Sequence, residues 1–134
     1  MAWRLVNERT GATVALDVEL ALDRPTRRRG LLGRAAMNPA SAMVLSPCWM
    51  VHTAFMQFAI DVVFVDRDGH VVRVAPDVQP WRAAMAMGGK TVIELPAGTV
   101  ARCAVNVGDR VTLVERGTPQ RAPALPLPLG VRRC

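Results

Sequence analysis

The apolar run from Phe58 to Val65, which leads into a turn sequence ending at Gly69, constrains the fold most strongly. The run is rich in Val, Ile and Phe, which favour strands, and the Asp-Gly pair of the turn is typical of a β-hairpin. The segment 70–75 is the predicted partner strand. Both faces of the run are apolar on the period-two rule, so we predict a central strand covered on both sides.

Short strand-like segments separated by turn signals continue along the rest of the chain. Strands are predicted at 3–7, 13–22, 91–95 and 110–115, with a short apolar run at 42–45 and a strand or irregular extended segment at 99–105. Asp23 as N-cap and Pro25 in the first turn predict a helix of about two turns over 26–33. The chain is therefore predicted to be mainly β, a compact sandwich-like or barrel-like single domain with one short α-helix.

The domain organisation follows from where this pattern stops. Residues 1–115 are predicted to form the single β-rich domain, and 116–134, with many prolines and four arginines, a flexible C-terminal tail. The segment 76–89 is predicted to be a long connection, and loops of that length in small domains are often functional.

The net charge of +6 raises the question of nucleic-acid binding. The four arginines from Arg116 onward carry most of this excess, because residues 1–115 hold 13 positive and 11 negative side chains, a net of +2. Nucleic acid is therefore the less favoured class of partner. No nucleotide-binding, metalloprotease or nucleophile-elbow motif occurs, so no cofactor or metal is expected.

The cysteines and the N-terminus bear on the compartment. Cys48, Cys103 and Cys134 form no CxxC pair, which favours reduced thiols, although a bond between Cys48 and Cys103 stays open. No secretory signal opens the sequence, which predicts a cytoplasmic protein. The uncharged stretch 41–60 is long enough to span a bilayer, but polar residues and a proline interrupt it, so no membrane span is predicted.

Asp61 is the residue of the central strand that most requires an explanation. A buried carboxylate is costly unless it is paired or hydrogen-bonded. One alternative is structural, with Asp61 in an ion pair or capping backbone N–H groups. The other is functional, with Asp61 as a pocket carboxylate that binds a ligand or acts as acid or base. Arg29, Arg34, His52 and Arg82 are its candidate partners.

Other residues suited to binding lie near this strand or in the long connection. Arg27, Arg28, Arg29 and Arg34 form a basic cluster that is either a solvated face or an anion site. Trp81 and Arg82 together suit a flat or anionic group, although Trp81 could equally pack as a lid. Cys48, His52 and Asp61 do not have a spacing that identifies a catalytic triad or a metal site.

A series of short motifs runs along the chain, from RGLLGR at 29–34 through PC at 47–48, HT at 52–53, ID at 60–61 and PWR at 80–82, to ELPAG at 94–98 and GD at 108–109. Taken in this order, the motifs resemble the family known as domain of unknown function 192. The resemblance covers roughly residues 5–115 and matches a branch with a His-Thr pair. It implies a compact β-rich domain from a bacterial or archaeal source, and it supplies no reaction.

We therefore predict a non-enzymatic accessory protein, a monomer or small oligomer, that binds a small polar or anionic ligand or a protein partner. Its predicted site is a polar pocket around Asp61 with Arg34, His52, Trp81 and Arg82. The first alternative is an undiscovered hydrolase or sugar- or nucleotide-acting enzyme that uses Asp61 and His52 as acid and base, and no catalytic residue is assigned beyond that. The second is weak nucleic-acid binding through the arginine cluster and the tail.

Overall fold

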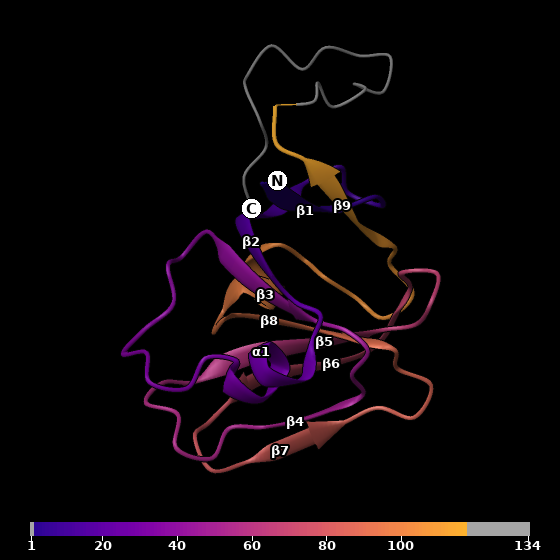
Figure 1. The fold of residues 1–134 in the computed structure, drawn as a ribbon. Coiled ribbons are helices and arrows are strands. Elements are labelled where there is room, and N and C mark those ends of the chain that lie inside the picture. Colours follow the sequence, from indigo (N-terminus) through magenta and orange to yellow (C-terminus); the bar gives the residue numbers. More distant parts are fainter. Residues whose placement is uncertain (1, 118–134) are drawn as a thin grey trace.

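The computed structural model describes residues 2–117 (Figure 1). This part of the chain forms nine strands and two short helices. In chain order they are β1 (Trp3–Asn7), β2 (Thr13–Ala21), α1 (Arg24–Arg29), β3 (Ser41–Leu45), β4 (Met50–His52), β5 (Ile60–Val65), β6 (Val71–Val78), β7 (Ala83–Met85), β8 (Thr91–Pro96), α2 (Thr99–Arg102) and β9 (Val111–Glu115). The mainly β fold predicted from the sequence is confirmed.

Seven strands form one sheet in the order β6-β5-β8-β3-β2-β1-β9, and β4 pairs with β7 in a separate two-stranded sheet. Only the pair β2–β3 is parallel among these described strands, with α1 in the connection between them. The large sheet curls, so that the start of β6 approaches β9 (Figure 1). Val71 N donates to Asp109 O at 2.8 Å and Gly108 N donates to Val71 O at 2.8 Å. The result is a half-barrel, which fits the barrel-like prediction.

The side chain of Asp109 anchors the loop that precedes β9. One of its carboxylate oxygens accepts from Arg9 Nε at 2.5 Å, and the other accepts from Asn7 Nδ2 and Asn106 N, each at 2.8 Å. The Arg9 hydrogen bond is the main cause that lowers the pKa of Asp109 to about 2. The carboxylate thus holds the loop that precedes β9 against the end of β1 and the turn that follows it.

The core consists of two apolar clusters on opposite faces of the large sheet. Every residue of β5 is buried. Val63 and Val65 belong to one cluster, whereas Ile60, Val62 and Phe64 belong to the other. The prediction of a central strand covered on both faces is therefore confirmed. The β4–β7 sheet covers the second cluster and contributes its inward-facing residues Val51 and Ala84.

The predicted helix is present, with its N-cap in place. Asp23 Oδ1 accepts from Thr26 N at 2.8 Å, and Pro25 lies in the first turn. The helix spans Arg24–Arg29, so it begins and ends earlier than predicted. Its end is set by Gly30, which takes a φ of 46° and donates its backbone N–H to Thr26 O. Positive φ is readily reached by glycine, which makes it a common helix terminator.

Two segments differ from the sequence expectation. Thr99–Arg102 is a helical turn, α2, instead of a strand or extended segment. The segment 76–89 is not simply a connection, because β6 continues to Val78 and β7 lies within it. Both differences arise from contacts with residues far along the chain, Asp61 for α2 and β4 for β7, which local pattern does not register.

Three further sequence expectations concern the cysteines, the membrane and the tail. Cys48 and Cys103 pack against different clusters, on opposite faces of the sheet, and no disulfide joins them. Among residues 2–117, neither helix has the length and apolar character needed to cross a bilayer. Arg116, the first residue of the predicted tail, pairs with Asp17 at 2.5 Å, and residues 118–134, with Cys134, lie outside the described part.

Candidate functional site

Asp61 is 1% exposed, and both of its carboxylate oxygens accept backbone hydrogen bonds. Oδ1 accepts from Asp77 N and Oδ2 accepts from Val100 N, each at 2.8 Å. Val100 lies in the first turn of α2, whose N-cap is Gly98 and has no side chain to accept from that turn. Asp61 therefore replaces the missing cap and also holds Asp77, which has a φ of 50°. These contacts favour the structural alternative, and a ligand-binding role for Asp61 stays a prediction.

Thr53, the second residue of the His-Thr pair, has a structural role. Its buried hydroxyl donates to Gln79 O at 2.6 Å and accepts from Arg82 N at 2.8 Å. Its backbone N–H donates to Arg82 O at 2.8 Å, and its carbonyl accepts from Trp81 N at 3.0 Å. One residue after β4 thus fixes the backbone that precedes β7. Thr53 belongs to the His-Thr motif of the sequence, and the motif alone gives no indication of this structural role.

Replacing Thr53 with Val is expected to lower the free energy of unfolding by about 2 kcal/mol, because a buried amide and carbonyl lose their hydroxyl partner. Urea denaturation measures the change. Thr112→Val is the matched control, since Thr112 is half-buried on β9 with no side-chain hydrogen bond recorded in the described structure. Equal stability losses for the two variants would contradict the role given to Thr53.

Trp81 and Arg82 are exposed at the end of the β4–β7 sheet. The Trp81 ring lies 4.5 Å from that of Phe55, centroid to centroid, with 59° between the ring planes. Phe55 and Trp81 each have a φ of 65°, in the left-handed region that non-glycine residues seldom adopt. Arg82 Nη1 donates to Trp81 O at 3.3 Å. Trp81 does not act as a buried lid, because 59% of it is exposed.

The remaining predicted site residues are His52 and Arg34. His52 is exposed on β4 opposite Ala83, which brings it to the same end of the small sheet as Trp81 and Arg82. Arg34 forms a forked pair with Glu19, at 2.8 and 2.7 Å. No recorded contact within residues 2–117 links Arg34 or Asp61 to the other three. The convergence of all five on one pocket stays a prediction.

A groove of about 300 Å³ separates α1 from β4, and we call it the α1–β4 groove. One wall carries Arg27, Arg28 and Arg29, and the other carries Met50 and His52. Buried apolar side chains form its floor: Leu31, Leu45, Val51 and Met56. His52 is the only predicted pocket residue in its lining, and the arginines come from the cluster that the sequence analysis singled out.

The arginines of α1 are short of carboxylate partners. Within residues 2–117, Arg24, Arg28 and Arg29 make no recorded ion pair, and Arg27 donates to the carbonyls of Leu22 and Ser46. The helix has no acidic residue in its first turn. Arginines near a helix C-terminus interact favourably with its dipole, but the dipole does not use their forked donors, which suit carboxylate or phosphate.

Glu94 is a buried carboxyl that the sequence analysis did not single out as a site residue. It lies on β8 between Met43 of β3 and Val62 of β5, and Oε2 has no hydrogen-bond partner in the described structure. Burial raises the pKa of Glu94 to about 7, opposed in part by the charge of Arg34. Desolvation is also the main cause of the raised pKa of the Cys48 thiol, to which the charge of Glu94 adds. The sequence signal that could have identified Glu94 is the presence of a Glu within an otherwise apolar predicted strand.

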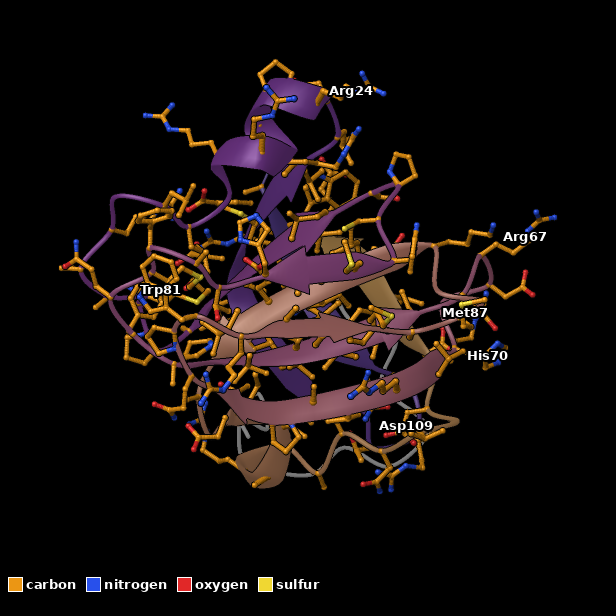
Figure 2. The ribbon with its side chains drawn as sticks, turned by 90° about the horizontal axis from the view of Figure 1, so that it is seen from below. Arg24, Arg67, His70, Trp81, Met87 and Asp109 are labelled. Atoms are coloured by element: carbon orange, nitrogen blue, oxygen red, sulfur yellow. The ribbon has the colours of Figure 1, made fainter. Side chains whose placement is uncertain are left out.

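The outer side of the β4–β7 sheet exposes an unusual share of large apolar side chains. Of the eight such side chains exposed within residues 2–117, six lie on or beside β4 and β7, and we call them the β4–β7 face: Trp49, Met50, Phe55, Trp81, Met85 and Met87. Figure 2, which views the molecule from the side of these strands, places Trp81 and Met87 at opposite ends of this face. An apolar surface of this kind often marks an interaction site.

The turn between β5 and β6 places ligand atoms of Asp66, Asp68 and His70 within 4.8 Å of one another. Turn geometry already explains this arrangement, because Asp66 Oδ1 accepts from Asp68 N at 2.9 Å and from His70 N at 3.0 Å. The backbone hydrogen bond from His70 is the leading cause of the lowered pKa of Asp66. The hairpin turn by itself accounts for the arrangement of the three side chains.

Comparison with known proteins identifies relatives of the whole domain. The model of the DUF192 family, described as Uncharacterized ACR, matches residues 5–113. A UPF0127 protein of Thermococcus sibiricus is 30% identical over 112 residues, covering 80% of this chain and 72% of that protein. A UPF0127 protein of Pyrococcus furiosus is 37% identical over 62 residues, covering 46% of this chain and 53% of that protein.

Two solved structures share the fold, each with a TM-score of 0.72. One is a protein of Sinorhizobium meliloti that has been proposed to be a transcription regulator. It is 30% identical and covers 82% of this chain and 90% of its own. The other, from Novosphingobium aromaticivorans, is described as having unknown function. It is 22% identical, with 84% of each chain covered, and supports the fold alone.

Proposed function

The chain belongs to the DUF192 family, and from that premise we propose that it is a non-enzymatic binding protein that holds an anionic group in the α1–β4 groove. The anion belongs to a small ligand or to a protein partner. The observation that carries the proposal is the pair of forked donors on Arg28 and Arg29, which line the groove without a carboxylate partner among residues 2–117. His52 faces them from β4.

The groove suits binding better than proton transfer. A forked guanidinium recognises a carboxylate or phosphate by two parallel hydrogen bonds and stays charged at any working pH. The acid and base of the enzyme alternative, Asp61 and His52, make no recorded contact with each other, and both Asp61 oxygens already accept from backbone. The groove instead combines fixed positive charge with an apolar floor, as ligand sites commonly do.

Binding is expected with small anions as probes. Inorganic phosphate, acetate and citrate are each titrated into the protein at low salt, followed by calorimetry and by thermal shift. A ligand at about 100 times its dissociation constant adds about 2.7 kcal/mol, which raises the melting temperature by several degrees. The double variant Arg28→Gln/Arg29→Gln is expected to bind at least about tenfold more weakly, a loss of about 1.4 kcal/mol.

Arg67→Gln/Arg110→Gln is the matched control, because it also removes two positive charges, from exposed side chains in and beside the β5–β6 turn, away from the groove. It is expected to bind the probes like the unchanged protein. Equal weakening by the control and the double variant would reduce the effect to net charge and contradict the proposal. Failure of all three anions to bind would contradict it as well.

The nucleic-acid alternative draws on the description of the Sinorhizobium meliloti relative as a proposed transcription regulator. It is tested with a 20-base-pair duplex in place of the small anions. Binding that requires the α1 arginines and weakens steeply with salt concentration would replace the proposed function with phosphate-backbone binding. Binding of small anions without duplex binding would retain the proposed function.

A further inference from the structure

One edge of β4 has no strand partner in the described structure. β4 pairs with β7 alone, in the register Met50↔Met85, Val51↔Ala84 and His52↔Ala83. Two hydrogen bonds just outside the strands fix the pattern, since Ala86 N donates to Trp49 O at 3.0 Å and Thr53 N donates to Arg82 O at 2.8 Å. Hydrogen-bonded pairs alternate in an antiparallel ladder. Val51 is therefore the residue of β4 whose backbone groups face β7.

The backbone groups of Met50 and His52 consequently face away from β7. Two side-chain contacts agree with this alternation. The thiol of Cys48 donates to Met50 O at 3.2 Å, from the side away from β7. On the opposite side of the small sheet, Arg73 donates to Met85 O from the neighbouring β6. The Met50 N–H and both backbone groups of His52 remain as the open edge of β4.

This open edge borders the α1–β4 groove, whose lining includes Met50, Val51 and His52 on one side and the α1 arginines on the other. A three-residue strand is about 10 Å long at about 3.3 Å per residue. The floor of the groove is apolar and its rim is basic. An added strand would meet three features together: backbone donors and acceptors, an apolar surface for alternate side chains, and guanidinium groups.

We infer that the partner held in this groove is an extended acidic peptide segment that adds as a strand to the open edge of β4. The inference rests on the proposed function and specifies its partner. Backbone hydrogen bonds from Met50 and His52 would supply affinity, while carboxylates of the segment would pair with Arg28 and Arg29. The exposed Met50 side chain, on the β4–β7 face, would pack beside the added strand.

Charge distinguishes this partner from a second copy of the chain. Two copies joined edge to edge along β4 would bring their α1 arginines together, with no recorded carboxylate partner for Arg28 or Arg29 within the described residues. Like charges at close range oppose such pairing. A lipid surface could meet the arginines and the β4–β7 face, but it would leave the strand edge unused.

The test uses capped five-residue peptides of alternating Glu and Val, with the Lys/Val counterpart as the charge control. Two further acidic peptides are N-methylated, one on its Glu residues and the other on its Val residues. In an added strand, alternate N–H groups face β4. One methylated isomer is therefore expected to bind at least about tenfold more weakly, while the other binds like the parent peptide. The Lys/Val peptide is expected not to bind.

A variant pair checks the same edge from the protein side. Met50→Pro removes the N–H that faces the groove and leaves the Val51–Ala84 hydrogen bonds in place, whereas Met50→Ala keeps the N–H and shortens the side chain. Met50→Pro is expected to weaken peptide binding at least about tenfold compared with Met50→Ala. Hydrogen-exchange protection of the Val51 and Ala84 amides reports that β4 still pairs with β7 in both variants. In the unchanged protein, the amides of Met50 and His52 are expected to gain protection from hydrogen exchange when the peptide binds.

The outcomes separate this inference from the proposed function. Equal binding of both methylated isomers, with phosphate still bound, would overturn strand addition and keep the anion site. Loss of phosphate and peptide binding together in the Arg28→Gln/Arg29→Gln protein, with alternation intact in the unchanged protein, would support both. Protection of Met50 and His52 by self-association in the absence of peptide, or binding to anionic vesicles without peptide binding, would overturn the inference in favour of a second copy or a lipid surface.

Discussion

Replacement of Asp61 by Asn is expected to lower the free energy of unfolding by about 2–3 kcal/mol, the typical cost of leaving one buried hydrogen-bond donor without its acceptor. The carboxylate accepts from Asp77 N and Val100 N, one on each oxygen. An amide has one acceptor oxygen, and its NH₂ group would face a backbone donor. One buried N–H would then lose its partner, and the first turn of α2 would lose its cap.

Urea denaturation measures the loss, and Asp68→Asn is the matched control because Asp68 is exposed in the β5–β6 turn. The control is expected to change stability by less than about 0.5 kcal/mol. Hydrogen exchange adds a local readout, since the amides of Asp77 and Val100 should lose protection before the rest of the core. An Asp61→Asn protein within about 1 kcal/mol of the unchanged protein would contradict the capping role. If that stable variant also lost an enzymatic activity, the acid–base alternative would gain support.

The stability of the unchanged protein is expected to fall by about 3 kcal/mol as the pH rises from about 4.5 to about 7, because of Glu94. Burial raises the pKa of this carboxyl from 4.5 to about 7. Between these two pH values the folded state holds a proton that the unfolded state has released. The contribution of protonated Glu94 to stability is therefore fully present below this window, decreases as the pH rises through it, and is lost above it.

Glu94→Gln removes the titration and is expected to flatten this part of the profile, leaving the variant more stable than the unchanged protein at pH 8. Urea denaturation at intervals from pH 4 to pH 8 measures both curves. Glu115→Gln, at an exposed position on β9, is the control and should keep the original slope. Asp109 does not interfere, because its lowered pKa of about 2 affects stability only below its ordinary value. Parallel curves for the Glu94 variant and the unchanged protein would contradict the assignment.

Much of the large sheet could be predicted because its signals are local. β5 is a continuous apolar run between a turn and a polar flank, and its burial on both faces follows from that composition. Asp23 and Pro25 predict the start of α1, because N-cap and first-turn preferences act within one helical turn. The requirement that Asp61 have a hydrogen-bond partner was also predictable, because burial of an unpaired carboxylate is costly in any fold.

The partners themselves were not predictable from the pattern. Asp61 is satisfied by backbone groups 16 and 39 residues away in the chain, so side-chain candidates such as Arg82 and Arg34 were not its recorded partners. α2 is a helical turn because Asp61 caps it, and the residues 99–105 alone read as extended. The recorded partner of Arg34, a predicted pocket residue, is Glu19 of β2, a pairing that the sequence pattern does not indicate.

The candidate groove shows the same division. The basic character of residues 27–29 is evident from the sequence, and so is the oddity of a His-Thr pair before a buried strand. The open edge of β4 depends on its pairing with β7, which lies about thirty residues later and is fixed by Thr53. A strand of three residues has too little local pattern to be recognised, and its existence depends on that partner.

Local patterns of residues are enough to predict the mainly β class, the covered central strand and the location of the basic helix, because hydrophobic period, turn chemistry and capping act over a few residues. Three other features arise only in the folded chain: the donors that hold Asp61, the burial of Glu94 without a hydrogen-bond partner for one oxygen, and the groove between α1 and β4. These features depend on contacts between segments distant in the chain, and only the folded sheet brings those segments within hydrogen-bonding and packing distance.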